Sequence, residues 1–233
     1  MITTEEKIKL IIKGKNDEDI HSLEEYKLFA APQGGDFQWK DGHSAKEFAK
    51  YILACNGCLP EKIQNIIKPY VEDGETLLLY PEHNTSFGAG MGRGRSRAHD
   101  GLLVGKNFVV GIEAKVNEPF GQYYLTQSIL NEHPKYKKVA DGVLKNNLKK
   151  EDFDKIRYQL CQASYTTIKE AKDRNAQVAV FLVIALNNGC VNEKNEADFK
   201  KFVEFLEKGD EEDRYLPKYA EDKVKFYVKN LTI

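Results

Sequence analysis

Apolar residues in the middle of the chain form short runs that are separated by turn residues. Two such runs, at residues 102–104 and 108–110, flank a Gly-Lys-Asn sequence. This pattern is typical of a β-hairpin with a short turn. If the Lys and Asn alone form the turn, Gly105 faces Phe108, and the register of the whole hairpin follows from that pair.

This register places three charged side chains together at one end of the hairpin. Asp100 lies opposite Glu113, with Cβ atoms roughly 5 Å apart on the same face of the sheet. Lys115 shares that face because side chains alternate along a strand. Burying three charges there would lower the stability of the fold by several kcal/mol unless the charges are paired. A divalent cation and a structural ion pair of Lys115 with a carboxylate would each meet this need.

Helical periodicity and further apolar runs predict the other elements. Ser44 followed by Glu47 is typical of a capping box at a helix start, and Gly57 suits the end of that helix. Pro81 is expected to end a strand. We expect helices at residues 1–31, 45–56, 60–67, 153–172 and 197–206, with strands at 75–80 and 176–186 and an edge strand at 223–231.

The order of these elements predicts an α/β fold with a mixed central sheet flanked by helices. Residues 1–233 are interpreted as a single domain with its core at about residues 45–186. A helical N-terminal extension precedes this core. Residues 122–152 are polar and rich in lysine and are interpreted as an insertion, and a helix plus a strand follows the core.

Composition narrows the class of protein. Apolar residues make up 41% of the 233, enough for a sizeable core, and the formal net charge is -1. Because no global basic field exists, an enzyme acting on nucleic acid would need a local basic patch. The start of the chain lacks the pattern of a signal peptide, and the longest apolar run, of nine residues, is too short to span a membrane. We therefore expect a cytoplasmic protein.

Four cysteines are too few and too scattered for a disulfide scaffold. Cys55 and Cys58 form a Cys-x-x-Cys motif, but a structural zinc ion needs two more ligands. Plain thiols at a helix end are the favoured interpretation.

The tripeptide Glu-x-Lys occurs five times in the chain. Four copies lie in charged helical or loop contexts, where a solvated surface explains them. Only Glu113 lies in an apolar strand with an aspartate expected opposite. This context singles out the hairpin as a candidate site.

Asp100 together with Glu113-Ala114-Lys115 resembles the signature of the PD-(D/E)XK nuclease superfamily, with His99 in place of the proline. The expected element order matches the αβββαβ core of that superfamily, a restriction-endonuclease-like fold. Four segments also resemble an uncharacterised bacterial domain family assigned to the superfamily. They are residues 39–47, 80–83, 113–121 and 157–160.

The resemblance implies a Mg²⁺-dependent nuclease, with Mn²⁺ as a possible substitute. Asp100 and Glu113 would bind the metal, with the carbonyl of Ala114 as a further ligand. Lys115 would orient or deprotonate the attacking water. A catalytically inactive nuclease fold, kept as a binding or regulatory module, is the main alternative, and a hydrolase of another phosphoester is a third.

Further candidate residues surround this set. Glu82 would supply another carboxylate and Gln159 an active-site amide, and Glu47 and His83 are weaker candidates. His99 is expected to face away, because it has the opposite strand parity from Asp100. Nucleic acid is the expected partner. Its phosphates would be contacted by Arg93, Arg95, Arg97 and Arg157, although a flexible loop and an exposed helix face explain these arginines equally well.

Overall fold

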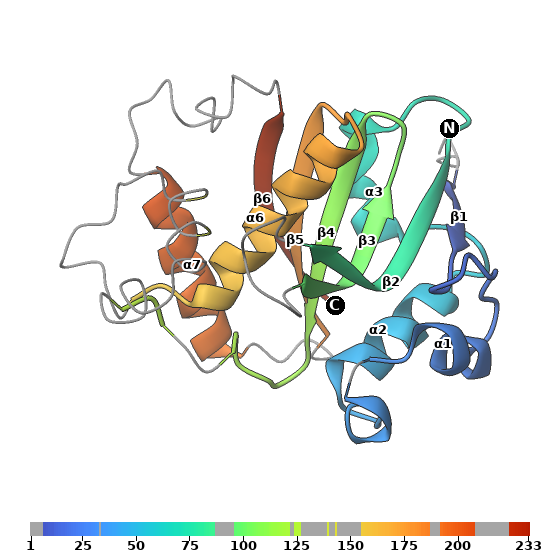
Figure 1. The fold of residues 1–233 in the computed structure, drawn as a ribbon, viewed down its shortest axis with the longest axis horizontal. Coiled ribbons are helices and arrows are strands. Elements are labelled where there is room, and N and C mark those ends of the chain that lie inside the picture. The colour runs from blue at the N-terminus through green and yellow to red at the C-terminus, as the bar shows by residue number, and fades with distance from the viewer. Residues whose placement is uncertain are drawn as a thin grey trace, which may run out of the picture.

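A six-stranded mixed sheet forms the centre of the protein in the computed structural model (Figure 1). The structure describes residues 7–32, 34–86, 96–121, 124–126, 139, 143, 155–186, 192–207 and 224–233. The strands lie in the order β1-β2-β3-β4-β5-β6. Their bounds are Lys9–Ile12, Thr76–Ser86, Ser96–Val104, Phe108–Lys115, Val178–Ala185 and Lys225–Thr232. Strands β2, β3 and β4 form an antiparallel meander, whereas β1 pairs parallel with β2, and β4, β5 and β6 pair parallel with one another.

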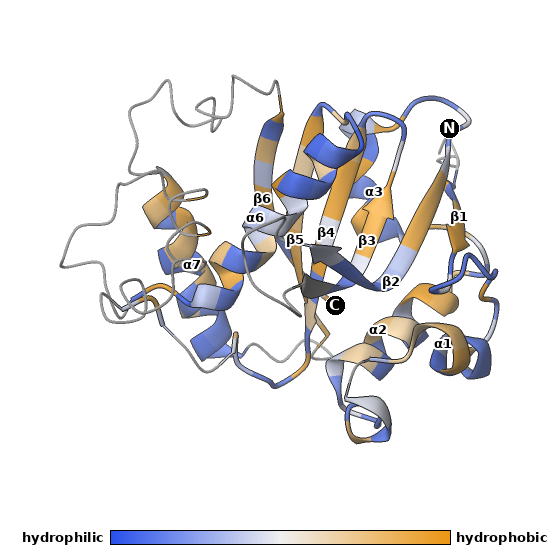
Figure 2. Ribbon diagram, in the orientation of Figure 1, coloured by the Kyte–Doolittle hydropathy of each residue, from blue (hydrophilic) through white to orange (hydrophobic). Residues whose placement is uncertain are grey.

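Helices cover both faces of the sheet, as the α/β class predicts. On one face, α6 (Tyr158–Asp173) and α7 (Glu193–Glu207) pack against side chains such as Val109 and Phe181. The opposite face carries α1 (Leu23–Ala30), α2 (Ser44–Leu53), α3 (Glu61–Ile67) and the 3₁₀ turns η1 (Gly35–Phe37) and η2 (Lys68–Tyr70). Strands β4 and β5 are apolar along most of their length (Figure 2) because both of their faces are covered.

Residues 9–12 form the strand β1, so the prediction of a helical N-terminal stretch is wrong there. The apolar residues at 8, 11 and 12 match a helical period, but the burial follows a strand period. Leu10 and Ile12 are buried, whereas Ile11 is 38% exposed. Pairing with β2 decides the outcome for this short segment, and the helix α1 begins only at Leu23.

Strand β2 continues through Pro81 to Ser86, so the prediction that the proline ends the strand is wrong. The ladder to β1 stops at Leu79, and beyond it β2 pairs only with β3. A proline fits such a position because one edge of the strand has no ladder hydrogen bond to lose.

The start of α2 differs from the predicted capping box. His43 is the N-cap and Ser44 is already helical. The carboxylate of Glu47 accepts a hydrogen bond from the amide of Gly42 at 2.9 Å and contacts Lys50. A capping box is present instead in α1, between Ser22 and Glu25.

The remaining predicted elements are confirmed, with shifted ends. The helices α3, α6 and α7 and the buried strand β5 lie where the sequence predicts them, and β6 is an edge strand. Residue 153, the predicted start of α6, lies outside the described residues. Among the few described residues between 122 and 152, Leu125, Val139 and Val143 are buried in the same core cluster as α6, so the interpretation as a polar insertion does not hold at these three positions. In the described part of the chain, no helix has the length and apolar character needed to cross a membrane.

Candidate active site

The β3–β4 hairpin has the register that the sequence predicts. Leu103 pairs with Val110 and Gly101 pairs with Ile112. The amide of Gly105 donates a hydrogen bond to the carbonyl of Phe108 at 3.0 Å, which closes the turn as expected. Continued by one residue beyond Gly101, this register brings Asp100 opposite Glu113.

Asp100 is fixed to the neighbouring strand by its side chain. Its Oδ2 accepts a hydrogen bond from the backbone amide of Ala114 at 2.6 Å. This bond ties the carboxylate to β4 at the residue between Glu113 and Lys115. The aspartate therefore lies next to both of its predicted partners.

Glu113 and Lys115 are buried at the carboxyl end of β4 and form an ion pair. Lys115 Nζ lies 2.8 Å from Glu113 Oε1, and the two residues are 8% and 3% exposed. Gln159, in the first turn of α6, donates from Nε2 to the same oxygen at 2.5 Å. The carboxylate of Glu113 is thus held by a cation and an amide from two different elements.

Glu82 completes a row of three acidic residues across β2, β3 and β4. The pairs Pro81–Gly101 and His83–His99 flank it, so Glu82 stands opposite Asp100. Its φ angle is +48°, in the left-handed region that residues other than glycine rarely adopt. Backbone strain of this kind costs roughly 1–3 kcal/mol and is concentrated at functional sites.

These residues line one pocket with a volume of about 420 Å³. Its acidic wall is formed by Glu82, Asp100, Glu113 and Glu118, and Lys115 and Gln159 lie beside them. The remaining lining residues come from the segment before α2 and from the first residues of that helix. The set predicted from the sequence as catalytic, namely Asp100, Glu113, Lys115, Glu82 and Gln159, therefore meets in a single cleft.

Glu118 is the main residue of this pocket that sequence reasoning missed. Its Oε1 accepts from the amide of Ser44 at 3.0 Å, and its Oε2 accepts from the amide of Val116 at 3.0 Å. Partial burial raises the pKa of Glu118, but these hydrogen bonds and the charge of Lys115 outweigh it, so the pKa lies below its ordinary value. Glu118 thereby joins the start of α2 to the end of β4. The sequence carried one hint, the position of this glutamate within the segment 113–121.

His43 was also missed; it lines the pocket as the N-cap of α2. The weaker candidate Glu47 does not join it. Glu47 lines a different pocket with Lys50 and Tyr51. Its contacts with Gly42 and Lys50 are structural.

His83 and His99 contact residues of α6 and do not line the pocket. His83 Nε2 lies 3.0 Å from Glu170 Oε1, and Thr85 donates to the same oxygen at 2.7 Å. His99 is wholly buried, beside Gly111 and Thr167, and does not line the pocket, as its strand parity predicted. Burial raises the pKa of Glu170, but the bonds from His83 and Thr85 and the pairing with Arg174 prevail and bring it to about 2.

Arg157 is not available to nucleic acid, which corrects the prediction that it contacts the substrate. It is 3% exposed, and its Nε donates to Asp198 Oδ2 at 2.7 Å. Its guanidinium also lies 3.8 Å from the centre of the Tyr124 ring. This arginine fastens the start of α6 to α7 instead.

The other predicted substrate contacts lie at the edge of the described chain. Arg93 and Arg95 lie outside the described residues. The backbone of Arg97 pairs with Thr85 in the β2–β3 ladder, and its side chain lies outside the described part. Cys55 and Cys58 are free thiols, in keeping with their interpretation from the sequence.

The described residues of the pocket offer few ligands for a metal ion. Among the described residues, no group of three His, Cys, Asp or Glu side chains is placed to hold a metal ion by itself. Mg²⁺, however, commonly uses one or two carboxylates and keeps several waters. Asp100 and Glu113, on neighbouring strands in an acidic cleft, fit that smaller requirement.

The fold and the cleft define an α/β protein with a mixed six-stranded sheet and an acidic pocket at the carboxyl end of β4. The family model described as Domain of unknown function (DUF6946) matches residues 5–233, and the chain belongs to that family. No curated protein and no solved structure matches the chain.

Proposed function

We propose that this protein is a Mg²⁺-dependent nuclease that hydrolyses phosphodiester bonds of nucleic acid. The observation that carries the proposal is the convergence of Asp100, Glu113 and Lys115 on one pocket, with Glu82 and Gln159 beside them. Two carboxylates, a lysine and a glutamine at the end of an antiparallel hairpin suit the stabilisation of a charged phosphate and of an attacking water.

The arrangement of the core supports a restriction-endonuclease-like fold. The elements α2, β2, β3, β4, α6 and β5 occur in the αβββαβ order of that fold, with α3 and η2 inserted between α2 and β2. Asp100 and Glu113 lie on the second and third strands of the meander, and Glu82 lies on the first. Gln159 comes from the helix that follows, where it reaches Glu113.

The donor set suits Mg²⁺ or Mn²⁺. Asp100 and Glu113 would hold the cation. The amide of Ala114 points towards Asp100, and the carbonyl of a strand residue points to the same side as its amide, so this carbonyl suits a further ligand. When bound, the cation polarises the phosphate and offsets its charge.

The chain's own residues supply the remaining functions. Lys115 is a buried cation whose position is fixed by Glu113. From there it would counter the charge that develops on the phosphate and would orient or deprotonate the attacking water. Gln159 keeps Glu113 in place. Arg93, Arg95 and Arg97 are proposed to contact phosphates further along the substrate.

The test is cleavage of a panel of single-stranded and double-stranded DNA and RNA with Mg²⁺ or Mn²⁺. We expect Lys115→Ala to lose at least about 100-fold in rate. Lys106→Ala, at the exposed hairpin turn, is the matched control and should cleave as the wild type does. Equal inactivity of the wild type and Lys115→Ala across the panel would reject the nuclease proposal for those substrates.

One observation favours the alternative, a nuclease fold kept as a binding module. The carboxylates are already engaged, Glu113 by Lys115 and Gln159 and Asp100 by the amide of Ala114. Calorimetry with Mn²⁺ separates the two proposals. A nuclease site should bind Mn²⁺ in the wild type and bind it at least about tenfold more weakly in Asp100→Asn. Asp41→Asn, which removes a surface carboxylate paired with Lys46 and Lys50, is the control.

A further inference from the structure

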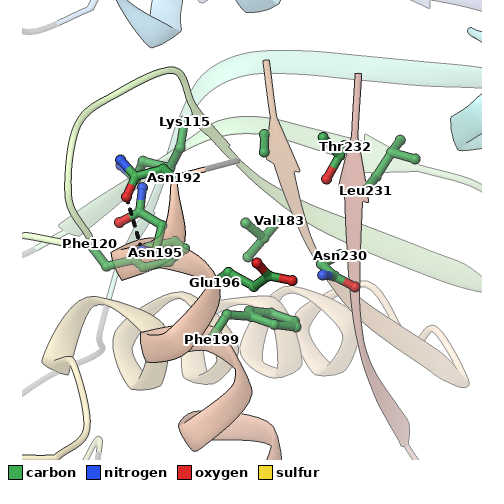
Figure 3. A pocket seen from close by; sticks show the side chains of 11 residues that line it. Lys115, Phe120, Val183, Asn192, Asn195, Glu196, Phe199, Asn230, Leu231 and Thr232 are labelled. Carbon is green, nitrogen blue, oxygen red and sulfur yellow. Dashed lines mark hydrogen bonds between the residues drawn. The ribbon is translucent and has the colours of Figure 1, made fainter. Parts of the chain in front are cut away.

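A second cavity shares Lys115 with the acidic pocket. It measures about 70 Å³ and is enclosed by the carboxyl ends of β4, β5 and β6 and by the first turns of α7 (Figure 3). Ligands bind preferentially at the carboxyl ends of the strands in open α/β sheets. Lys115 lines both cavities, so a group bound here would lie directly beside the proposed reaction centre.

The walls of this cavity change in character from floor to mouth. The buried side chains of Phe120, Val183 and Phe199 form an apolar floor. Exposed polar residues, among them Asn230 and Thr232 on β6, stand at the mouth. An apolar floor with a few polar groups at the rim is the pattern of a site for a small organic ring.

The charges make an anion an unsuitable ligand. Lys115 is balanced by Glu113 within the ion pair, and Glu196 adds a carboxylate to the rim. A phosphate would therefore gain little here. A neutral planar ring with hydrogen-bonding groups along its edge suits both the aromatic floor and the amides and hydroxyl of the rim.

The start of α7 couples this cavity to the acidic pocket. Asn195 Nδ2 donates to the carbonyl of Glu118 at 2.8 Å, and Asn192 Nδ2 donates to the carbonyl of Asn117 at 3.2 Å. The side chain of Glu118 in turn holds the amide of Ser44 in the acidic pocket. The two cavities therefore share one segment of backbone as well as Lys115.

We propose that this cavity receives one pyrimidine base of a nucleic acid whose neighbouring phosphate lies in the acidic pocket, an inference that rests on the proposed nuclease function. Its volume of about 70 Å³ is smaller than the roughly 150 Å³ of a dry engineered cavity that binds benzene. A single ring would therefore enter by its edge and remain partly in the mouth, and the larger fused rings of a purine would leave more of their apolar surface outside the cavity. Such a base must leave a stack, so the substrate is single-stranded or locally unpaired.

The experiment is an NMR titration of the metal-free protein with cytidine, thymidine and adenosine, which carry no phosphate. The methyl signals of Val183 report on the cavity, and those of Leu28, exposed on α1, are the control signals. We expect the pyrimidine nucleosides to shift the cavity signals with a Kd at least about fivefold below that of adenosine. Ala185→Phe, which fills the cavity from β5, should abolish these shifts.

Asn230→Ala is the milder variant, at an exposed rim position where folding is not at risk. It should weaken pyrimidine binding at least about threefold, whereas Asn16→Ala, distant on the N-terminal segment, should leave it unchanged. The proposal is overturned if adenosine binds as tightly as the pyrimidines, or if no nucleoside shifts the cavity signals. It is also overturned if the shifts persist in a folded Ala185→Phe protein or, should that variant not fold, if Asn230→Ala binds the pyrimidines with the same Kd as the wild type.

Failure of this inference and failure of the nuclease proposal give different results. If cleavage depends on Lys115 but shows no preference for pyrimidines, the nuclease proposal stands and the proposed base site is rejected. If pyrimidines bind in the cavity but no nucleic acid is cleaved, the base site stands and the nuclease proposal fails. The cavity is then a nucleic-acid contact of a catalytically inactive protein.

Discussion

Lys115 Nζ lies 2.8 Å from Glu113 Oε1, two residues earlier on the same buried strand. Residues i and i+2 of a strand point to one face, so the pair is set by the alternation of β4 alone. Gln159 then adds a second donor to the same oxygen from α6. One carboxylate oxygen thus joins the strand, the helix and the cation at the centre of the acidic pocket.

Gln159 is predicted to position Glu113. Gln159→Leu keeps a similar volume but removes the amide donor. We expect affinity for Mn²⁺ and any cleavage rate to fall by about 10- to 100-fold, the usual effect of losing a partner behind a metal ligand. Calorimetry and cleavage assays measure this, and Gln162→Leu on the same helix is the control. Unchanged binding and cleavage would mean that the hydrogen bond has no functional role.

The left-handed backbone of Glu82 predicts an unusual order of stabilities. Glu82→Ala and Glu82→Gly lose the same side chain, but only glycine adopts a φ of +48° without strain. We expect the glycine variant to be more stable than the alanine variant by about 1 kcal/mol in urea unfolding. At Thr76, on the same strand but without a positive φ, the order should reverse. If the glycine variant is the more stable of the two at both positions, or the alanine variant at both, the strained geometry of Glu82 is contradicted.

Glu170 predicts how stability depends on pH. Its pKa is held at about 2, below the ordinary value of 4.5, so the unfolded chain takes up the proton first as the pH falls. The resulting stabilisation is fully present above about pH 4.5 and is lost between about pH 4.5 and 2. It amounts to at most about 3 kcal/mol.

Urea unfolding of the wild type and Glu170→Gln from pH 7 to pH 3 measures this difference. We expect the wild type to be more stable at pH 7 and the gap to narrow below pH 4.5. Glu204→Gln, at an exposed position on α7, should show a small gap that does not change with pH. A gap that is constant for Glu170→Gln would contradict the proposed linkage.

Arg157 is predicted to act in stability and not in binding. Its partner Asp198 is also buried, so Arg157→Leu leaves an unpaired charge inside the protein. We expect a loss of about 3–5 kcal/mol, much of it recovered when Asp198→Leu is added. Chemical denaturation tests this. A stable Arg157→Leu protein with weakened nucleic-acid binding would restore the original prediction of a substrate contact.

The sequence by itself determined the hairpin and its charged residues. The turn at Lys106 and Asn107 and the alternation of apolar residues are local features, and together they fix the register that places Asp100 beside Glu113. The continuous apolar run of β5 likewise identified a strand buried on both faces. Such patterns are reliable because a shift by one residue would turn every buried side chain to the wrong face.

Only the tertiary structure decided which distant segments meet. Strand β1 exists because β2 pairs with it, and Pro81 is tolerated because β1 ends at its side. The bond of Glu118 to Ser44 spans 74 residues and that of Arg157 to Asp198 spans 41, so no local period announces either one. The second cavity, which shares Lys115 with the acidic pocket, likewise arises where the ends of three strands and α7 come together. These features depend on contacts between segments far apart in the chain, whereas periodicity and turn chemistry describe only neighbours.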